Sequence, residues 1–196
     1  MTKLAVILLT MGLVALAPSC FAATGNQNSI GKSQSSGDPI YMNYEGITPA
    51  NTGACSGIHL DSFSWGVKRG ITAPTGGATG REASAPSVSE IVVTKQTDTS
   101  SVKLLNEALK GEGKLVKIDF CKTTKEGKMI PYLQYILENT LISGFSISSG
   151  GDRPTESLSL NFVKVTMSMP GGDSMSWDLV TLIGVLIGLN NPSIGQ

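Results

Sequence analysis

Six stretches of the chain are rich in β-branched and aromatic residues, and turn-forming residues separate each stretch from the next. In KLVKIDFCKT the alternation places Val116, Ile118 and Phe120 on one face of a strand, toward a core. Asp119 and Cys121 then lie on the opposite face, away from that core, which we expect to be solvated. The six stretches are PIYMNYEGI, IHLDSFSWGV, SEIVVTKQTD, KLVKIDFCKT, PYLQYILENTLISGFSIS and ESLSLNFVKVTMS.

A single segment has the period of a helix instead of a strand. In SSVKLLNEALKG, the side chains of Val102, Leu105 and Leu109 recur about one helical turn apart, and Gly111 ends the pattern. One helix of about ten residues cannot cover both faces of a six-stranded sheet, so the sheet must largely cover itself. The predicted fold is therefore mainly β: a small closed or nearly closed antiparallel β-barrel of two packed sheets, with one flanking α-helix.

The first 22 residues have the order of a secretory signal peptide. Lys3 precedes an apolar stretch from Leu4 to Ala17, and small residues follow where a signal peptidase would cut, after Ala22. A retained anchor and a lipoprotein attached at Cys20 are the alternatives. We expect a secreted or periplasmic protein with a signal peptide over 1–22, a flexible polar arm over 23–38, a β-barrel domain over 39–181 and an apolar extension over 182–196.

Two cysteines remain after that cleavage, Cys55 and Cys121, and an oxidising compartment would allow them to form a disulfide. The alternative is two free thiols that are too far apart, because a disulfide needs Cα atoms roughly 4.4–6.8 Å apart. The chain carries 15 basic and 15 acidic residues, so the loss of Lys3 leaves 14 against 15. This balance favours neither nucleic acid nor an anionic membrane as a partner.

The sequence lacks the patterns of catalytic and metal sites. His59 is the only histidine, and a surface histidine is favoured over a metal ligand because no second histidine or close cysteine pair accompanies it. Phe63 and Trp65 share a strand face and are expected in the core instead of forming a ligand platform. We expect no catalytic site, no metal and no cofactor.

Three charged residues crowd into SGGDRPTESLSLNF at the entrance of a predicted strand: Asp152, Arg153 and Glu156. No histidine lies near them in the sequence and no acidic pair has a motif around it, which disfavours a reaction centre. Arg153 can donate two hydrogen bonds to a carboxylate, either that of Glu156 or one on a neighbouring subunit. We interpret the cluster as structural, with a solvated surface turn as the alternative.

Four segments follow one another in the order and approximate spacing of a known family, and they cover most of Ile40 to Met169. They are YMNYEGI with HLDSFSWGV, SEIVVTKQTDTSSVKLLNEALKG, YLQYILENTLISGFSISSGG and DRPTESLSLNFVKV. These segments resemble the haemolysin-coregulated tube proteins of bacterial type VI secretion. The resemblance implies a non-enzymatic subunit of homohexameric rings that stack into a tube, with effectors and the spike and sheath of the machine as partners.

The resemblance also assigns roles to charged residues. The polar stretch TAPTGGATGREASAPS exceeds about 12–15 residues, a length at which loops are usually functional or disordered. In the family this loop reaches the next ring, so its only charged residues, Arg81 and Glu82, are the expected ring-stacking contacts. Asp152, Arg153 and Glu156 would then form a ring interface or a structural ion pair.

Two features depart from the family: the signal peptide, and the apolar run from Leu179 to Leu189. That run of about 11 residues is too short to cross a membrane, so we expect a buried final strand or a tail that docks on a partner. The alternative function is a monomeric exported β-barrel that binds a small apolar ligand or a secreted protein in its mouth.

Overall fold

The structure, a computed structural model, describes residues 37–49, 52–71 and 83–188. In this part of the chain no helix is long and apolar enough to cross a membrane. The elements are β1 (Ile40–Tyr44), β2 (Ile58–Leu60), β3 (Ser62–Ser64), β4 (Val67–Lys68), β5 (Ser87–Val88), β6 (Ile91–Gln96), α1 (Ser101–Lys110), β7 (Lys114–Thr123), β8 (Met129–Ser148), β9 (Thr155–Asn161), β10 (Lys164–Ser168), β11 (Ser174–Asp178) and β12 (Ile183–Ile187).

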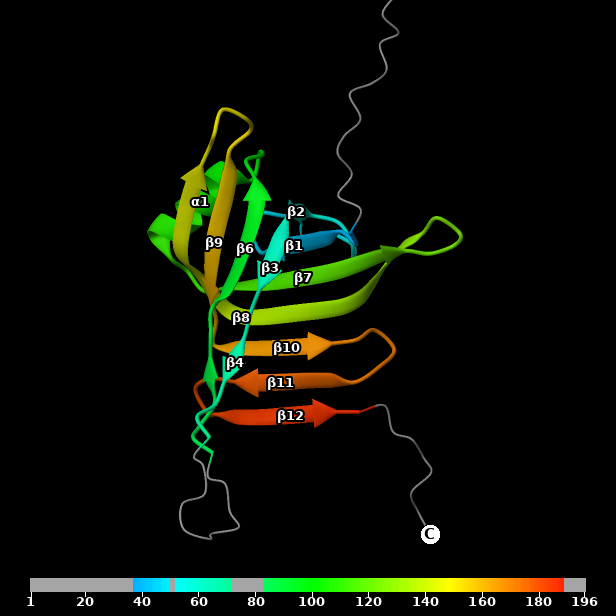
Figure 1. The fold of residues 1–196 in the computed structure, drawn as a ribbon, viewed down its shortest axis with the longest axis vertical. Coiled ribbons are helices and arrows are strands. Elements are labelled where there is room, and N and C mark those ends of the chain that lie inside the picture. Colours follow the sequence, from blue (N-terminus) through cyan, green and yellow to red (C-terminus); the bar gives the residue numbers. More distant parts are fainter. Residues whose placement is uncertain (1–36, 50–51, 72–82, 189–196) are drawn as a thin grey trace, which may run out of the picture. The chain divides into compact units, whose positions relative to one another are not determined.

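A nearly closed antiparallel barrel forms the body of the domain (Figure 1). One branch of the sheet runs from β8 through β7 and β1 to β2, and the other runs from β8 through β9 and β6 to β3. Only Asp61 separates β2 from β3, and its N–H donates to the Thr94 carbonyl of β6 at 2.8 Å. The two branches therefore meet at this bend, and the fold predicted from the sequence is confirmed.

The strand β8 joins the two branches because it is long enough to belong to both. Its 20 residues pair first with β7 and β10 and then, from Leu141 onward, with β9. The register shifts between Ile142 and Gly144. A Cβ atom at Gly144 would lie 3.2 Å from the Ser159 hydroxyl, so the missing side chain allows β9 to approach closely at the shift.

Alternate side chains of each barrel strand fill the interior. On β6 the side chains of Ile91 and Val93 are fully buried, and on β9 those of Leu158 and Leu160 are. Complete burial of one such side chain stabilises the fold by roughly 1.5–3 kcal/mol. The buried cluster also contains Met42, Tyr44, Ile58, Leu60, Leu104, Val116, Ile118, Tyr135, Leu137, Ile142, Phe162 and Val165.

The helix α1 packs on the barrel through a different face from the one that carries the regularly spaced apolar residues of the sequence. Leu104 is fully buried and Ser101 nearly so, whereas Val102 and Leu109 are 77% and 79% exposed. The helix ends at Gly111, which adopts a left-handed conformation with φ near +62°. The helix exists as predicted, but most of its regularly spaced apolar side chains face solvent.

The solvated face predicted for the strand KLVKIDFCKT, now β7, is wrong at two positions. Asp119 and Cys121 have no exposed surface, although their side chains leave β7 on the face opposite to Ile118. The loop that carries Cys55 covers them, and the register with β8 shifts between Phe120 and Cys121. This part of β7 is therefore buried on both faces.

Three further strands extend the sheet beyond the barrel (Figure 1). β10 pairs with β8, β11 pairs with β10, and β12 pairs with β11. Within the described residues β12 has no second neighbour, so it forms the free edge of this extension. A separate short ribbon, the antiparallel pair β4 and β5, projects from the same end of the barrel.

Candidate functional site

The charged cluster of the sequence leads to an ion pair inside the barrel. Glu156 lies on β9 directly opposite Lys95 on β6, and both side chains are fully buried. The Lys95 ammonium is 3.0 Å from Glu156 Oε2, and it also donates to the Gln96 carbonyl at 2.8 Å. A buried charge is tolerated only when it is paired and hydrogen-bonded in this way.

The same ammonium reaches the start of α1. It lies 3.0 Å from Asp98 Oδ1 and 3.2 Å from the Ser101 hydroxyl, which in turn accepts a hydrogen bond from the Asp98 N–H at 2.9 Å. Burial favours a higher pKa for Asp98, but hydrogen bonds from Ser100 and Lys95 outweigh burial and lower that pKa. The network therefore links β6, β9 and the first turn of the helix.

Arg153 and Asp152 take no part in that ion pair. Both are exposed, and Arg153 Nε donates to the Thr97 carbonyl at 2.8 Å. No salt bridge joins Arg153 to a carboxylate within the described residues. The partner of Glu156 is Lys95, which the sequence interpretation missed, and not Arg153. The other interpretation, in which Arg153 binds a carboxylate of a neighbouring subunit at a ring interface, stays a prediction.

A disulfide between Cys55 and Cys121 holds the loop after β1 against β7. The Cα atoms are 5.8 Å apart, and the bond joins residues separated by 66 positions. Beneath the loop, the buried carboxylate of Asp119 accepts hydrogen bonds from the Cys55 N–H at 3.3 Å and from Gln134 Nε2 at 2.7 Å. The disulfide and this carboxylate together fix the loop beside the edge strand β2.

The ribbon of β4 and β5 carries the long polar loop. Between these strands and the loop, the Ser84 N–H donates to the Gly70 carbonyl at 2.9 Å, and the Arg69 guanidinium donates to the Ser84 carbonyl at 2.6 Å. Arg81 and Glu82 lie outside the described residues. The structure therefore places the base of the loop, and the stacking role of its two charged residues stays a prediction.

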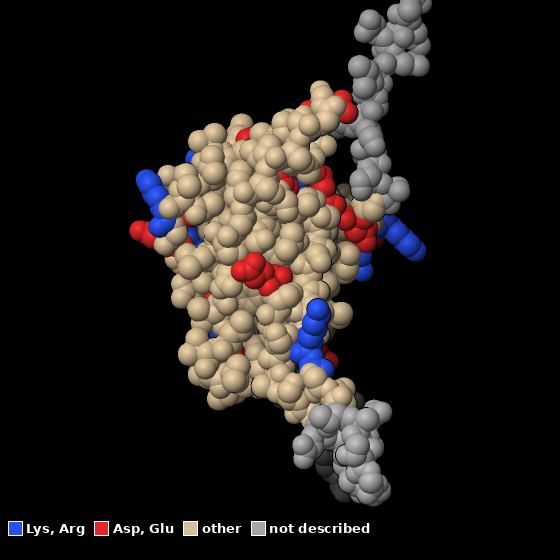
Figure 2. Space-filling model, turned by 60° about the vertical axis from the view of Figure 1, so that its left-hand side comes forward, with Lys and Arg blue, Asp and Glu red and all other residues tan. Residues whose placement is uncertain are grey.

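The last strand, β12, is exposed along its whole length. Its sequence IGVLI is apolar on both faces of the strand, and Ile183, Leu186 and Ile187 are 60%, 70% and 63% exposed. An exposed apolar edge strand, whose outer row of backbone groups has no partner, is a site for association with another chain. In Figure 2, which shows one face of the molecule, charged side chains are scattered over a mostly uncharged surface.

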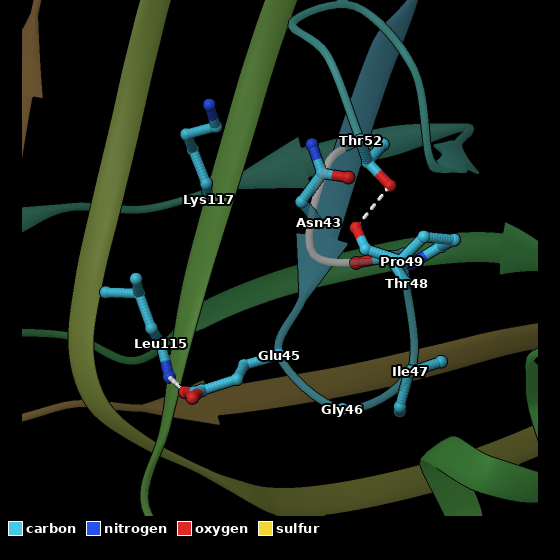
Figure 3. Close-up of a pocket in the computed structure, with 9 residues that line it drawn as sticks. All are labelled: Asn43, Glu45, Gly46, Ile47, Thr48, Pro49, Thr52, Leu115 and Lys117. Atoms are coloured by element: carbon cyan, nitrogen blue, oxygen red, sulfur yellow. Dashed lines mark hydrogen bonds between the residues drawn. The ribbon is translucent and has the colours of Figure 1, made fainter.

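A pocket of about 650 Å³ lies beside β1 and β7 (Figure 3). Asn43 and Lys117 rise from neighbouring strands, and Glu45 turns away to accept the Leu115 N–H at 2.8 Å.

Other residues singled out in the sequence have ordinary surroundings. His59 is exposed and lies 3.9 Å from Asp61, and no group of three potential metal ligands occurs in the described ranges. Phe63 and Trp65 are partly buried against the core, where Phe63 stacks on Tyr135 at 5.0 Å.

A model of the family "Type VI secretion system effector, Hcp" matches residues 41–169, which is more than half of the chain. This chain belongs to the Hcp family. The family identified from the sequence segments is thereby confirmed, and the chain is a tube or effector protein of type VI secretion. No protein matches in a search of the curated proteins.

Solved Hcp structures share the fold. One, described as a type six secretion system protein, is 22% identical, with a TM-score of 0.64 over 76% of this chain and 99% of that chain. Hcp1 from Salmonella typhimurium is 18% identical, with a TM-score of 0.60 over 76% and 99%. A type VI secretion system effector from Yersinia pestis is 17% identical, with a TM-score of 0.52 over 76% and 99%. At these identities the likeness supports the fold alone.

Proposed function

We propose that this Hcp protein forms homohexameric rings, which stack into a tube that carries or shelters secreted effectors. The observation that carries the proposal is the free edge of β12, whose five residues are all exposed although four of them are large and apolar. Burial of those side chains and pairing of the free backbone groups both favour association. A ring closes through a heterologous contact, in which this edge meets a different surface of the next subunit.

The mass of the purified chain in solution tests ring formation. Light scattering after size exclusion should give about six times the mass of one subunit. A monomeric mass over a wide range of concentrations would contradict the ring and favour the alternative, an exported barrel that binds a ligand or a secreted protein.

Stacking is tested separately from ring closure. We propose that the loop between β4 and β5, with Arg81 and Glu82, contacts the next ring. Replacing Pro74 to Ala85 by a short Gly-Ser turn has a small loop-closure cost, so the ring mass should persist while tube formation at high concentration weakens. Loss of the ring itself, or undiminished tubes, would assign the loop to another interface.

Export is a further part of the proposal. The order of charge, apolar core and small residues in 1–22 supports cleavage after Ala22 and secretion or a periplasmic location. N-terminal sequencing of protein recovered from the periplasm or the medium should begin at Ala23. Recovery of an intact Met1 form from cytoplasm alone would contradict export.

A further inference from the structure

An apolar groove of about 580 Å³ lies between the ribbon and the outer strands of the sheet. Trp65, Val67 and Val88 form the ribbon wall, and Met175 and Trp177 of β11 form the other wall. No acidic residue lines the groove within the described part of the chain. Its size is that of a site for one small molecule.

Both indoles are held in place by the surrounding structure. Trp177 lies across Gly184 of β12, where an added Cβ would come within 2.7 Å of the indole ring. Trp65 contacts the ring of Tyr135 edge to face at 5.7 Å. A groove whose walls are fixed beforehand loses little entropy when a ligand enters.

The groove offers a ligand apolar indole rings and two cations. The indole nitrogens of Trp65 and Trp177 are buried, and neither has a hydrogen-bond partner among the described residues. Because both nitrogens are shielded from solvent, the indoles present apolar ring atoms to the groove and not a hydrogen-bond donor. Lys68 and Arg69 also line the groove, and the described residues pair neither cation with a carboxylate.

We infer that the groove binds a small amphipathic anion, an elongated apolar molecule that ends in one carboxylate or a similar group. The apolar body lies between the two indoles, and the anionic end contacts Arg69. Trp65 and Arg69 are four positions apart, at most about 13 Å along the backbone, a length that an extended molecule of roughly ten carbons also covers. This site is separate from the proposed role in a tube and does not depend on it.

The two tryptophans provide a direct measurement, because they are the only two in the chain and both line the groove. The probe is ω-bromodecanoate, whose bromine quenches tryptophan fluorescence on contact. We expect saturable quenching with one probe bound per subunit of the full chain. The neutral analogue ω-bromodecanol should bind about tenfold more weakly, because it makes no charge-assisted contact with Arg69.

Three variants locate the site. Arg69→Gln should weaken the anion about tenfold and leave the neutral analogue unchanged. Val67→Glu, at a side chain that is 53% exposed, should abolish binding of the anion, whereas Val102→Glu on α1, 77% exposed, should leave it unchanged. Absence of saturable quenching in the unmodified chain would overturn the inference. The same result is expected if a second copy of the chain covers the groove, and it would overturn the inference as well. Binding that Val67→Glu leaves intact would also overturn it.

Discussion

The barrel buries the charged pair Lys95 and Glu156 completely, whereas the outer sheet leaves the apolar side chains of β12 in solvent. In the barrel, the cost of desolvating this pair is offset by the hydrogen bonds of the Lys95 ammonium within the same domain. In the outer sheet, apolar surface and free backbone groups have no partner within the described residues. Substitutions in the first region should therefore change the stability of the subunit, and substitutions in the second should change its assembly.

Removing the buried cation should have the largest effect on stability. Lys95→Met leaves the Glu156 carboxylate buried without its partner, which should lower the free energy of unfolding by about 3–5 kcal/mol. The matched control is Lys103→Met on the exposed side of α1, which should change it by less than about 0.5 kcal/mol. Urea unfolding of both variants measures the difference.

The double variant Lys95→Met/Glu156→Leu should recover most of that loss, because no unpaired charge remains in the barrel. If Lys95→Met is as stable as the unmodified chain, the buried ion pair does not contribute to the stability of the barrel, and the stated difference between the barrel and the outer sheet is wrong on this point.

Breaking the disulfide should have the next largest effect. The bond closes a loop of 66 residues, and its removal should cost about 4 kcal/mol by the loop-entropy model. Unfolding with and without reductant measures this loss, and the variant Cys55→Ala/Cys121→Ala should not respond to reductant. Two free thiols per unfolded, unreduced chain would contradict the bond.

A charge on the free edge should act on assembly instead of stability. Val185 on β12 is 51% exposed, so Val185→Lys should change the free energy of unfolding by less than about 0.5 kcal/mol while the ring mass falls toward that of one subunit. Val102→Lys on α1 carries the same change at a comparably exposed apolar position and should leave the mass unchanged. A ring that tolerates Val185→Lys would place the subunit contact elsewhere.

The smallest effect concerns pH. In the folded protein the pKa of Asp98 is lowered from its ordinary value of 3.8. The stability that the ionised carboxylate contributes is therefore fully present at a pH above the pKa of the unfolded state, and it is lost as the pH falls through the pKa of the folded state. Because the side chain is partly exposed, the contribution should be below about 1 kcal/mol. Asp98→Asn should flatten the loss of stability below about pH 4, measured against the unmodified chain. An unchanged acid profile would show that Ser100 and Lys95 do not bind the Asp98 carboxylate in solution.

Part of the buried ion pair was visible in the sequence. Lys95 continues the apolar alternation of Ile91 and Val93, and Glu156 has the same parity as Leu158 and Leu160. A charged residue at a core position needs a partner, which indicates that each should have one. The pairing itself could not be read, because it depends on the register between β6 and β9, whose paired residues are 61 positions apart.

The six β-rich stretches, the single helix, the barrel and the family could all be predicted from the sequence, because alternation, turn residues and motif order are properties of neighbouring positions. The short ribbon strand β5 and the last strand β12 lie outside those six stretches. The tertiary structure is what buries Asp119 and Cys121, because their cover comes from a loop far away in the chain. It also decided that α1 packs through Leu104 and not through Val102, because the approach of the barrel selects the buried side of a helix. The groove between the ribbon and β11 likewise exists only where two distant segments meet, so no local pattern could predict it.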